Sequence, residues 1–390
     1  MADKGVREGT MITQTHSIRV LVVDDSTFMR NTISTMLMKY PDVQVVGTAK
    51  NGREALLQVA RVAPDVMTLD VDMPEMNGLE VLDRVMAAHP IPVVMVSSLT
   101  HAGAAETFQA LARGAFDFIH KQQRVSPGDL GPLEARLYEK IKSAFDNKSR
   151  FLHSLGKRQT GLAGCTEVKF ASPASVLSGM ARGTGDVRSG ETSVRVRQVT
   201  ADLLVIGGST GAPQVLTEMF RHIPESFPVP ILIVQHMPKF FTSVFASQLA
   251  KCARIPVREG RDGDVLEAGK ALIAPGDHHV TVNRDAHGVP NIRISDEPRD
   301  RLYWPCIDLA LSSAAKHYGE RVLALILSGM GQDGLVGCRQ IRAGGGKVLV
   351  QDEQSSMVYG MNRAVWEAGF ADEMIPGPHV GPRLMEIVGG

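Results

Sequence analysis

Short apolar runs alternate with amphipathic segments along residues 18–150. The first run, Ile18–Val23, is rich in β-branched residues, and Ser26 is a suitable N-cap for a helix over residues 26–39. Nearly continuous apolar strands joined by helices are typical of a parallel, doubly wound sheet covered on both faces. The pattern predicts further strands at 43–48, 65–70, 92–97 and 116–120, and further helices at 51–62, 79–88, 104–113 and 132–148.

The alternation resumes near residue 201 and predicts a second α/β domain. A stretch over residues 280–295 alternates apolar and polar positions about a turn, which indicates a hairpin. The expected strands are 201–206, 231–235, 271–274, 322–327 and 347–350, and the expected helices are 213–222, 243–253, 307–317, 335–343 and 362–368.

Residues 151–198 interrupt both patterns. The segment is rich in Gly, Ser, Thr and Arg, and its aromatic residues are Phe151 and Phe170. Such a composition buries little apolar surface, so we interpret the segment as a flexible linker. Its modest basic excess leaves a docking segment as the alternative. The predicted division is a disordered segment at 1–17, a first domain at 18–140, a helix end and linker at 141–198, and a second domain at 199–390.

Composition narrows the functional classes. Lys plus Arg and Asp plus Glu each number 42, so the chain has no net charge that would favour nucleic acid or an anionic membrane surface. No apolar run approaches the length of a transmembrane helix, and the first seventeen residues contain no apolar signal core. The 4 cysteines form no CxxC pair and are expected to be reduced thiols in a cytoplasmic protein.

Acidic residues follow the predicted strands of the first domain. Asp24 and Asp25 end the first strand, Asp70 ends the third, and Ser97 and Lys121 end the fourth and fifth. The carboxyl ends of parallel strands share one edge, where ligands bind. Clustered carboxylates suit Mg²⁺, and a carboxylate beside that ion can attack phosphorus to form an acyl phosphate.

These motifs resemble those of two-component receiver domains, over residues 18 to about 140. The matching segments are Val-Val-Asp-Asp-Ser26, Leu-Asp-Val-Asp-Met-Pro74, Val-Ser-Ser98 and Lys121. The resemblance implies a flavodoxin-like receiver in which Asp70 accepts a phosphoryl group. It further implies an Mg²⁺ site and a switch. The implied Mg²⁺ ligands are Asp24, Asp25, Asp70 and the backbone of Asp72, and the implied switch residues are Ser97, Phe118 and Lys121. The family usually has Pro after the lysine, where this chain has Gln122.

A second set of reactive residues lies at strand ends of the second domain. Ser209 stands in a Gly-x-Ser-x-Gly turn between a strand and a helix, which fits a nucleophile elbow. His236 and Asp333 follow two later strands, so all three are expected at one edge of the sheet. Together they supply a nucleophile, a base and a carboxylate that orients the base. Backbone N–H groups near Thr210 and Met330 are candidate oxyanion donors.

These motifs resemble the catalytic domain of the chemotaxis protein-glutamate methylesterase family, over residues 199 to 390. The segments that carry the likeness are Gly-Ser-Thr-Gly211, Gln-His-Met-Pro238, Ile-Ala-Pro-Gly-Asp277, His-His279, Ala-Lys-His317 and Gly-Met-Gly-Gln-Asp-Gly334. A small departure is Ala212, where the family commonly has Gly. The resemblance implies a Rossmann-like domain and hydrolysis of glutamate γ-methyl esters, and it suggests deamidation of receptor glutamines.

The combined resemblance implies a phosphorylation-activated esterase of chemotactic adaptation. It implies methyl-accepting chemotaxis receptors as substrates, a chemotaxis histidine kinase as phosphoryl source, and Mg²⁺ in the receiver, with no cofactor for the esterase reaction. We expect no nucleic-acid binding and no membrane insertion. Two alternatives stay open on the residues alone. One is a phosphorylation-regulated binding module with a silent hydrolase domain, and the other is a nucleotide site in the Gly-rich turn at Ser209. A DNA-binding role is discounted because the second domain has no helix-turn-helix pattern.

Overall fold

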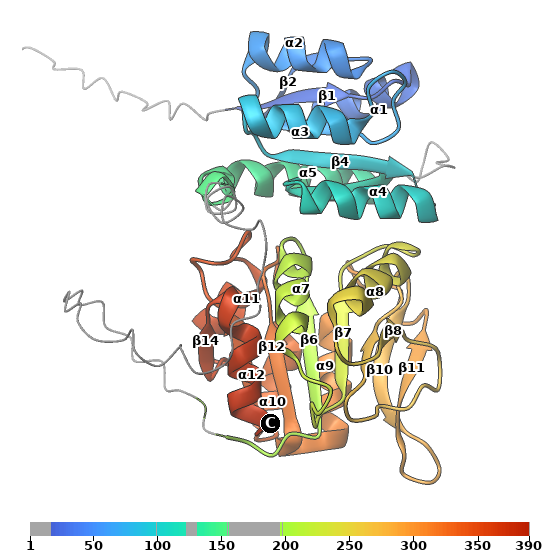
Figure 1. The fold of residues 1–390 in the computed structure, drawn as a ribbon, viewed down its shortest axis with the longest axis vertical. Helices are drawn as coiled ribbons and strands as arrows, with labels where there is room; N and C mark the ends of the chain where they lie inside the picture. Colours follow the sequence, from blue (N-terminus) through green and yellow to red (C-terminus); the bar gives the residue numbers. More distant parts are fainter. Residues whose placement is uncertain are drawn as a thin grey trace, which may run out of the picture.

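Two parallel sheets, each with helices on both faces, organise the chain (Figure 1). The computed structural model describes residues 17–98, 100–121, 131–153, 155, 196 and 198–389. Within these residues the first sheet lies in the N-terminal part and the second in the C-terminal part, which confirms the predicted pair of α/β units. Every helix of these ranges is too short or too polar to cross a bilayer.

The N-terminal sheet has the strand order β2-β1-β3-β4-β5, with all neighbours parallel. This order places the carboxyl ends of β1 and β3 side by side. The elements follow the predicted ranges within a few residues. They are β1 (Ile18–Val23), α1 (Thr27–Leu37), β2 (Val43–Ala49), α2 (Gly52–Val62), β3 (Val66–Asp70), α3 (Gly78–Ala88), β4 (Val93–Ser98), α4 (His101–Ala112), β5 (Asp117–Lys121) and α5 (Gly131–Asp146).

Local capping explains where several of these helices begin. The Ser26 hydroxyl accepts a hydrogen bond from the N–H of Met29 at 3.4 Å, as its position predicted. Helix α3 begins with a capping box, in which Asn77 and Glu80 satisfy each other's backbone N–H groups. Ser26 and Asn77 stand just after the loops that carry Asp25 and Asp72. These two caps therefore fix where those loops end.

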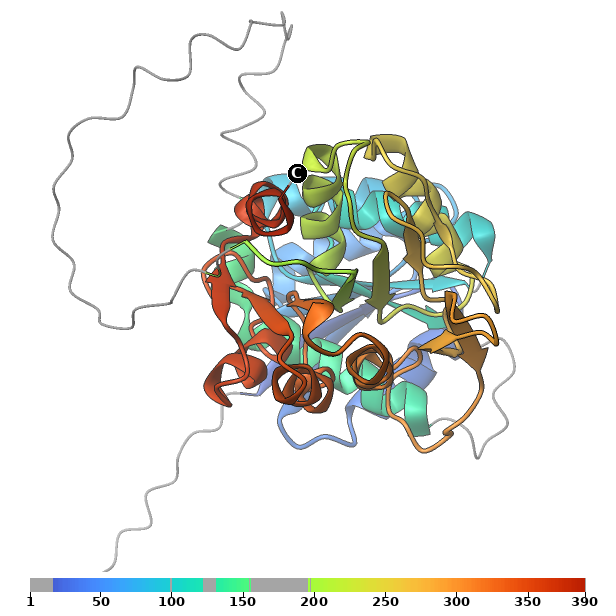
Figure 2. The ribbon, with the colours of Figure 1, turned by 90° about the horizontal axis from the view of Figure 1, so that it is seen from below.

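The C-terminal sheet has the order β14-β13-β12-β6-β7-β9-β8 and is also parallel. Helices α7, α8 and α12 cover one face, and α9, α10 and α11 cover the other (Figure 2). The strands are β6 (Leu203–Gly208), β7 (Ile231–Gln235), β8 (Val257–Glu259), β9 (Ala271–Ile273), β12 (Val322–Ile326), β13 (Lys347–Gln351) and β14 (Glu373–Ile375). The helices are α7 (Ala212–His222), α8 (Phe241–Cys252), α9 (Ile307–Tyr318), α10 (Leu335–Ala343), α11 (Met361–Glu367) and α12 (Val380–Val388).

The predicted hairpin is confirmed as the antiparallel pair β10 (His279–Arg284) and β11 (Pro290–Ser295). Two strands and one α-helix of the described residues were not predicted, namely β8, β14 and α12. The two strands have only three residues each, too few for an alternation to be recognised. Helix α12 contains Gly381 and Pro382, which commonly mark loops.

Phe151 differs from its predicted place in a linker. Its side chain is 1% exposed and packs edge-on against Phe116, with ring centroids 5.6 Å apart. Helical structure continues past α5 to this residue, and Leu152 and Leu155 also pack against the apolar core. The remainder of the predicted linker lies outside the described residues, apart from residues 152, 153, 155, 196 and 198. The predicted disordered segment up to residue 16 and Gln122 also lie outside them.

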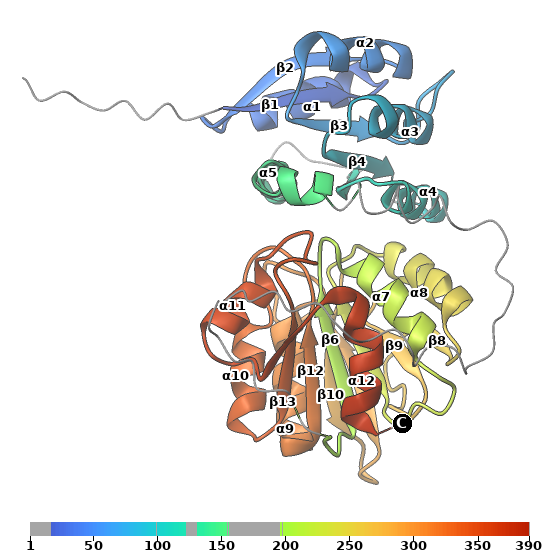
Figure 3. The same cartoon turned by 60° about the vertical axis from the view of Figure 1, so that its left-hand side comes forward.

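Helices α4 and α5 lie between the N-terminal sheet and the C-terminal domain (Figure 3). The ring of Phe118, from β5, stacks on Phe241 at the start of α8 with centroids 4.5 Å apart. Phe108 of α4 stacks on Phe245 of α8 at 5.5 Å. The buried residues of the N-terminal domain and of the α7, α8 and α12 face therefore form one continuous apolar cluster.

Candidate phosphoacceptor and hydrolase sites

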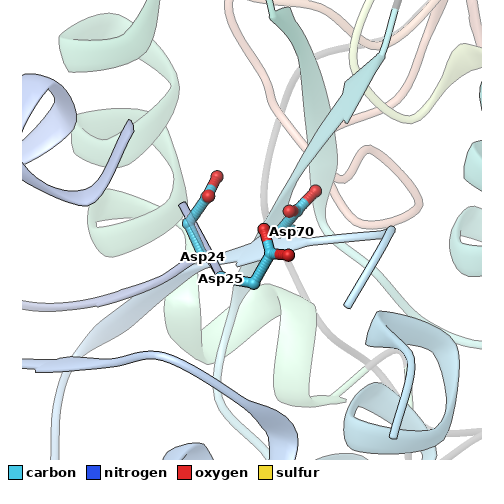
Figure 4. Close-up of side chains that lie close together, drawn as sticks. All are labelled: Asp24, Asp25 and Asp70. Carbon is cyan, nitrogen blue, oxygen red and sulfur yellow. The ribbon is translucent and has the colours of Figure 1, made fainter. Parts of the chain in front are cut away.

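Three carboxylates meet at the carboxyl ends of β1 and β3, as the strand order requires. The ligand atoms of Asp24, Asp25 and Asp70 lie within 4.8 Å of one another (Figure 4). Asp24 and Asp70 are buried, whereas Asp25 is exposed. Buried carboxylate oxygens at this spacing repel each other, and a hard divalent cation such as Mg²⁺ is the ligand that relieves the repulsion.

Lys121 joins this cluster from the end of β5. Its Nζ lies 2.7 Å from Asp70 Oδ2 and 3.0 Å from Asp24 Oδ2. Burial alone would lower the pKa of Lys121, but the two carboxylates outweigh burial and raise it, so the ammonium stays charged. Burial raises the pKa of Asp70 to about 6, against the opposing effect of Lys121. The cluster thus places the Asp70 carboxyl group, whose pKa is raised, beside the positively charged Lys121.

The three remaining residues singled out in this domain have distinct surroundings. The exposed Asp72 donates its backbone N–H to Asp70 Oδ1 at 3.3 Å, which places the backbone of residue 72 beside the cluster. The buried Ser97 hydroxyl donates to the carbonyl of Gly103 in α4 at 3.0 Å. Phe118 faces the C-terminal domain. Ser97 is thus bonded to α4, and Phe118 of β5 packs on α8 of the C-terminal domain.

The turn after β6 holds Ser209 by backbone contacts on two sides. The Ser209 N–H donates to the carbonyl of Ser328 at 3.1 Å, and its carbonyl accepts from Gln235 Nε2 at 2.9 Å. Gly211 has a φ of +86°, and a Cβ there would lie 2.7 Å from Met357 Cβ. Only glycine satisfies both the backbone and the space at this position. This is the sharp, tightly packed turn that a nucleophile elbow requires.

His236 follows β7 and forms a hydrogen bond through Nε2 to Asp333 Oδ2 at 2.8 Å. Both side chains are nearly buried, at 8% and 6% exposure. The other ring nitrogen, Nδ1, is buried and has no hydrogen-bond partner among the described residues. The two nitrogens are thus used in the opposite sense to the serine-protease arrangement, in which the carboxylate takes Nδ1. This leaves Nδ1 of His236 available to accept a proton and to donate it again.

Asp333 is held by donors from the start of α9 as well as by His236. The backbone N–H groups of Ile307 and Asp308 reach its two oxygens at 2.8 and 2.9 Å, and Cys306 Sγ lies 3.4 Å away. Burial acts to raise the pKa of Asp333, but the hydrogen bonds from His236 and the backbone outweigh it, and the pKa is lowered. Asp333 is therefore a fixed anion.

A cavity of about 280 Å³ brings Ser209, His236, Thr210 and Met330 together, all as lining residues. Both domains build its wall. The N-terminal residues that line it are Phe118, Ile119, His120, Arg136, Glu139 and Lys140. Ser209 and His236 thus line one cavity, Asp333 joins them through its hydrogen bond to His236, and the N-terminal domain forms part of the wall.

Residues that sequence reasoning missed complete the site. Gln235 anchors Ser209, and it stands directly before His236 in a motif that had been noted. Asp308 accepts hydrogen bonds from the N–H groups of Gly334 and Gly337 at 2.9 and 2.8 Å, so it fixes the loop that carries Asp333. Tyr303 stacks on His236 from an irregular segment without any periodic signal. Gln235 and Asp308 lie next to residues or elements that the sequence pattern singles out. Nothing in the sequence around Tyr303 indicates a role for it.

The fold and the two sites define a receiver domain followed by a hydrolase domain, and the comparisons agree. The family model described as response regulator receiver domain matches residues 20–128, and that described as CheB methylesterase matches residues 204–384. A protein-glutamate methylesterase/protein-glutamine glutaminase from Alkalilimnicola ehrlichii is 37% identical, over 95% of this chain and 99% of the relative. One from Oleidesulfovibrio alaskensis is 39% identical, over the same shares of both chains.

The chain therefore belongs to the protein-glutamate methylesterase/protein-glutamine glutaminase family. Among solved structures, the Thermotoga maritima CheB methylesterase catalytic domain is 34% identical, and the match covers 48% of this chain and 99% of that one with a TM-score of 0.47. The family membership favours a hydrolase over a nucleotide site in the turn at Ser209.

Proposed function

We propose that this chain is a phosphorylation-activated serine esterase that hydrolyses glutamate γ-methyl esters on methyl-accepting chemotaxis receptors, releasing methanol. Deamidation of receptor glutamines uses the same acyl intermediate with ammonia as the leaving group. The observation that carries the proposal is the bond between His236 and Asp333 in the cavity that Ser209 also lines. Family membership supplies the substrate class.

The reaction follows from the roles of three side chains. Ser209 Oγ attacks the ester carbonyl while His236 Nδ1 accepts its proton, and the imidazolium then protonates the departing methoxide. Water, deprotonated by His236, hydrolyses the acyl-serine and frees the glutamate carboxylate. Asp333 keeps Nε2 protonated and stabilises the imidazolium in both steps. The backbone N–H groups of Thr210 and Met330 are the proposed donors to the oxyanion, since both residues line the cavity beside Ser209.

The receiver supplies control through Asp70, which we assign as the phosphoacceptor for a chemotaxis histidine kinase. Asp24, Asp25, Asp70 and the backbone carbonyl of Asp72 are the proposed ligands of Mg²⁺, which when bound neutralises charge on the incoming phosphoryl group. Lys121 contributes a fixed positive charge to the same oxygens. Phosphorylation adds a charge of about −1.5 to −2 to this cluster.

The proposed switch runs from the acidic cluster to the interface. Ser97 joins the cluster to α4, and Phe118 packs against the catalytic domain. Phosphorylation of Asp70 moves both, and this weakens the cover over Ser209. In this scheme residues 18–140 form the receiver, residues 199–390 the catalytic domain, and residues 141–198 the connection, and the protein works in the cytoplasm, where receptor signalling helices lie.

The test is methanol release from methylated receptor membranes, with and without a small-molecule phosphodonor and Mg²⁺. Wild type should release methanol, and the phosphodonor should increase the rate. Ser209→Ala should release none in either condition while keeping its receiver phosphorylation. Methanol release by Ser209→Ala at the wild-type rate would exclude the serine mechanism. A wild type that releases no methanol but binds receptors would identify a silent hydrolase domain acting as a binding module.

A further inference from the structure

The aromatic ring of Tyr303 covers one face of the His236 imidazole. The ring centroids lie 4.2 Å apart and the planes are within 8° of parallel. Asp333 holds the edge of the same imidazole at Nε2, so the edge and a face are fixed by different residues. A tilt of the imidazole plane would break the stack on Tyr303, whereas a half-turn about the Cβ–Cγ bond keeps the plane and would break the bond to Asp333. Tyr303 therefore sets the plane of the ring, and Asp333 sets the direction of Nδ1 within that plane.

Tyr303 is itself held in place through its neighbour in the chain. Trp304 packs on His279 with centroids 4.2 Å apart, and His279 has no exposed surface. The ring nitrogens of His279 tie down both ends of this segment, since Nδ1 accepts from the N–H of Cys306 at 3.3 Å and Nε2 contacts the Pro298 carbonyl at 3.0 Å. His279, at the start of β10, thus anchors the segment before α9. This anchor fixes the position of Tyr303.

The loop that carries Asp333 leaves room for the phenol. A Cβ at Gly331 would lie 2.8 Å from Tyr303 Oη, and Gly331 has a φ of +81°. Burial, with the nearby charges of Glu139 and Asp333, raises the pKa of Tyr303 to about 12. The phenol is therefore neutral at physiological pH and does not act as a base.

We propose that Tyr303 is a positioning residue of the esterase, which fixes the plane of His236 and stabilises its imidazolium form through the face of the ring. A π face attracts a cation that lies over it, and an imidazolium forms at this place whenever Ser209 gives up its proton. The neutral imidazole of the resting enzyme gains less from the same face. The contact therefore strengthens as the transition state is approached, and such contacts raise kcat. This inference rests on the proposed serine mechanism.

Two substitutions separate the ring from the hydroxyl. Tyr303→Phe keeps the stacked ring, and Tyr303→Leu removes it while retaining apolar volume. We expect Tyr303→Phe to keep kcat within about twofold of wild type, and Tyr303→Leu to lower kcat about tenfold with KM nearly unchanged. The assay is methanol release from methylated receptor by the full chain with phosphodonor present.

A matched control removes a stacked tyrosine elsewhere. Tyr40 stacks on Tyr138 in the receiver with centroids 3.7 Å apart and planes 3° from parallel. Tyr40→Leu should leave kcat unchanged, because that pair lies outside the cavity. A fall in kcat of equal size in Tyr40→Leu and Tyr303→Leu would indicate a general loss of structure and overturn the inference.

A spectroscopic measurement tests the stack without relying on turnover. Protons over the face of an aromatic ring resonate upfield, so the His236 ring protons should be shifted upfield in wild type and Tyr303→Phe but not in Tyr303→Leu. An active wild type together with an unchanged kcat in Tyr303→Leu would overturn the positioning role alone. A wild type without methanol release, but with the upfield shift present, would instead contradict the proposed function.

Discussion

The hydroxyl of Thr210, next to Ser209, donates a hydrogen bond to the carboxylate of Asp117 in receiver strand β5. Asp117 also pairs with Lys140 Nζ at 2.6 Å and stands directly before Phe118 in the chain. Its side chain is buried, and Oδ1 accepts from the N–H of Phe118 at 2.7 Å. One carboxylate thus connects the catalytic turn, helix α5 and the residue that stacks across the interface.

Removal of this carboxylate should release the cover over the hydrolase site. Asp117→Ala loses the hydrogen bond to Thr210 and leaves Lys140 without its partner. Hydrogen bonds to charged groups contribute about 1.5–3 kcal/mol, so we expect methanol release without phosphodonor to rise about tenfold or more. The control is Asp83→Ala, which removes a half-exposed ion pair with Arg113 on the same domain. Equal basal rates in the two variants would show that Asp117 does not restrain the enzyme.

Asp333→Asn should disable proton transfer, and it also replaces one of the two oxygens that accept backbone N–H groups at the start of α9. The amide has nearly the same shape, but it removes the charge that stabilises the imidazolium and changes which hydrogen bond His236 Nε2 makes. The comparable substitution in a serine protease lowers kcat by about four orders of magnitude, and we expect a loss of at least about a thousandfold with little change in KM. Steady-state kinetics with methylated receptor measure both constants. A loss below tenfold would remove Asp333 from the mechanism.

Asp70→Ala should leave basal catalysis intact and abolish its activation by phosphorylation. The variant lacks the proposed phosphoacceptor, but residues 203–375 of the catalytic sheet are untouched. Basal methanol release should match wild type, and addition of phosphodonor with Mg²⁺ should cause no increase. Chelation of Mg²⁺ with EDTA should have the same effect on wild type. Stimulation of Asp70→Ala to the wild-type level would show that another residue accepts the phosphoryl group.

His120 should make receiver stability sensitive to acid. Burial, with the charges of Arg136 and Lys140, lowers the pKa of this imidazole from 6.5 to about 4. Between pH 6.5 and pH 4 the His120 imidazole therefore binds a proton in the unfolded chain but not in the folded chain. The free energy of unfolding should fall by about 3 kcal/mol as the pH drops from 6.5 to 4.

The measurement compares urea unfolding of wild type and His120→Gln at pH 7 and pH 4.5. Other titrating groups are common to both proteins and cancel in the difference, so the variant should lose less stability at the lower pH. His89→Gln, at an exposed position, is the control and should behave as wild type. Identical pH dependence in all three proteins would contradict the buried, neutral state of His120.

Local patterns predicted most of the fold, because most helices and strands have a signal of their own. Val66–Asp70 is a strand buried at every position, and the predicted helix at 79–88 matches α3 within one residue. The rule that parallel strands share a carboxyl edge then brought Ser209, His236 and Asp333 together without any knowledge of coordinates. The shared location of these three residues could be predicted because it depends only on where the strands end.

What the sequence did not reveal depends on contacts between distant segments. Phe151 was assigned to a linker by the composition around it, whereas its burial depends on Phe116. The hydrogen bond of Thr210 to Asp117 joins residues 93 positions apart in different domains. Which nitrogen of His236 faces Asp333 depends on a side-chain rotation that spacing does not encode. Tyr303 lies in a segment without periodicity, so its place follows only from the packing of Trp304 on His279.

The paired phenylalanine rings at α4, β5 and α8 have a consequence for the activated enzyme. Separation of the domains transfers Phe108, Phe118, Phe241 and Phe245 from one another's surfaces into water. Hydration of so much aromatic area is unfavourable, so under the proposed activation an opened form would be less stable than the closed one and would close again once the phosphoryl group is lost. In that proposal the aromatic interface that covers the hydrolase site also ends the active state, because loss of the phosphoryl group would be enough to let the domains pack together again.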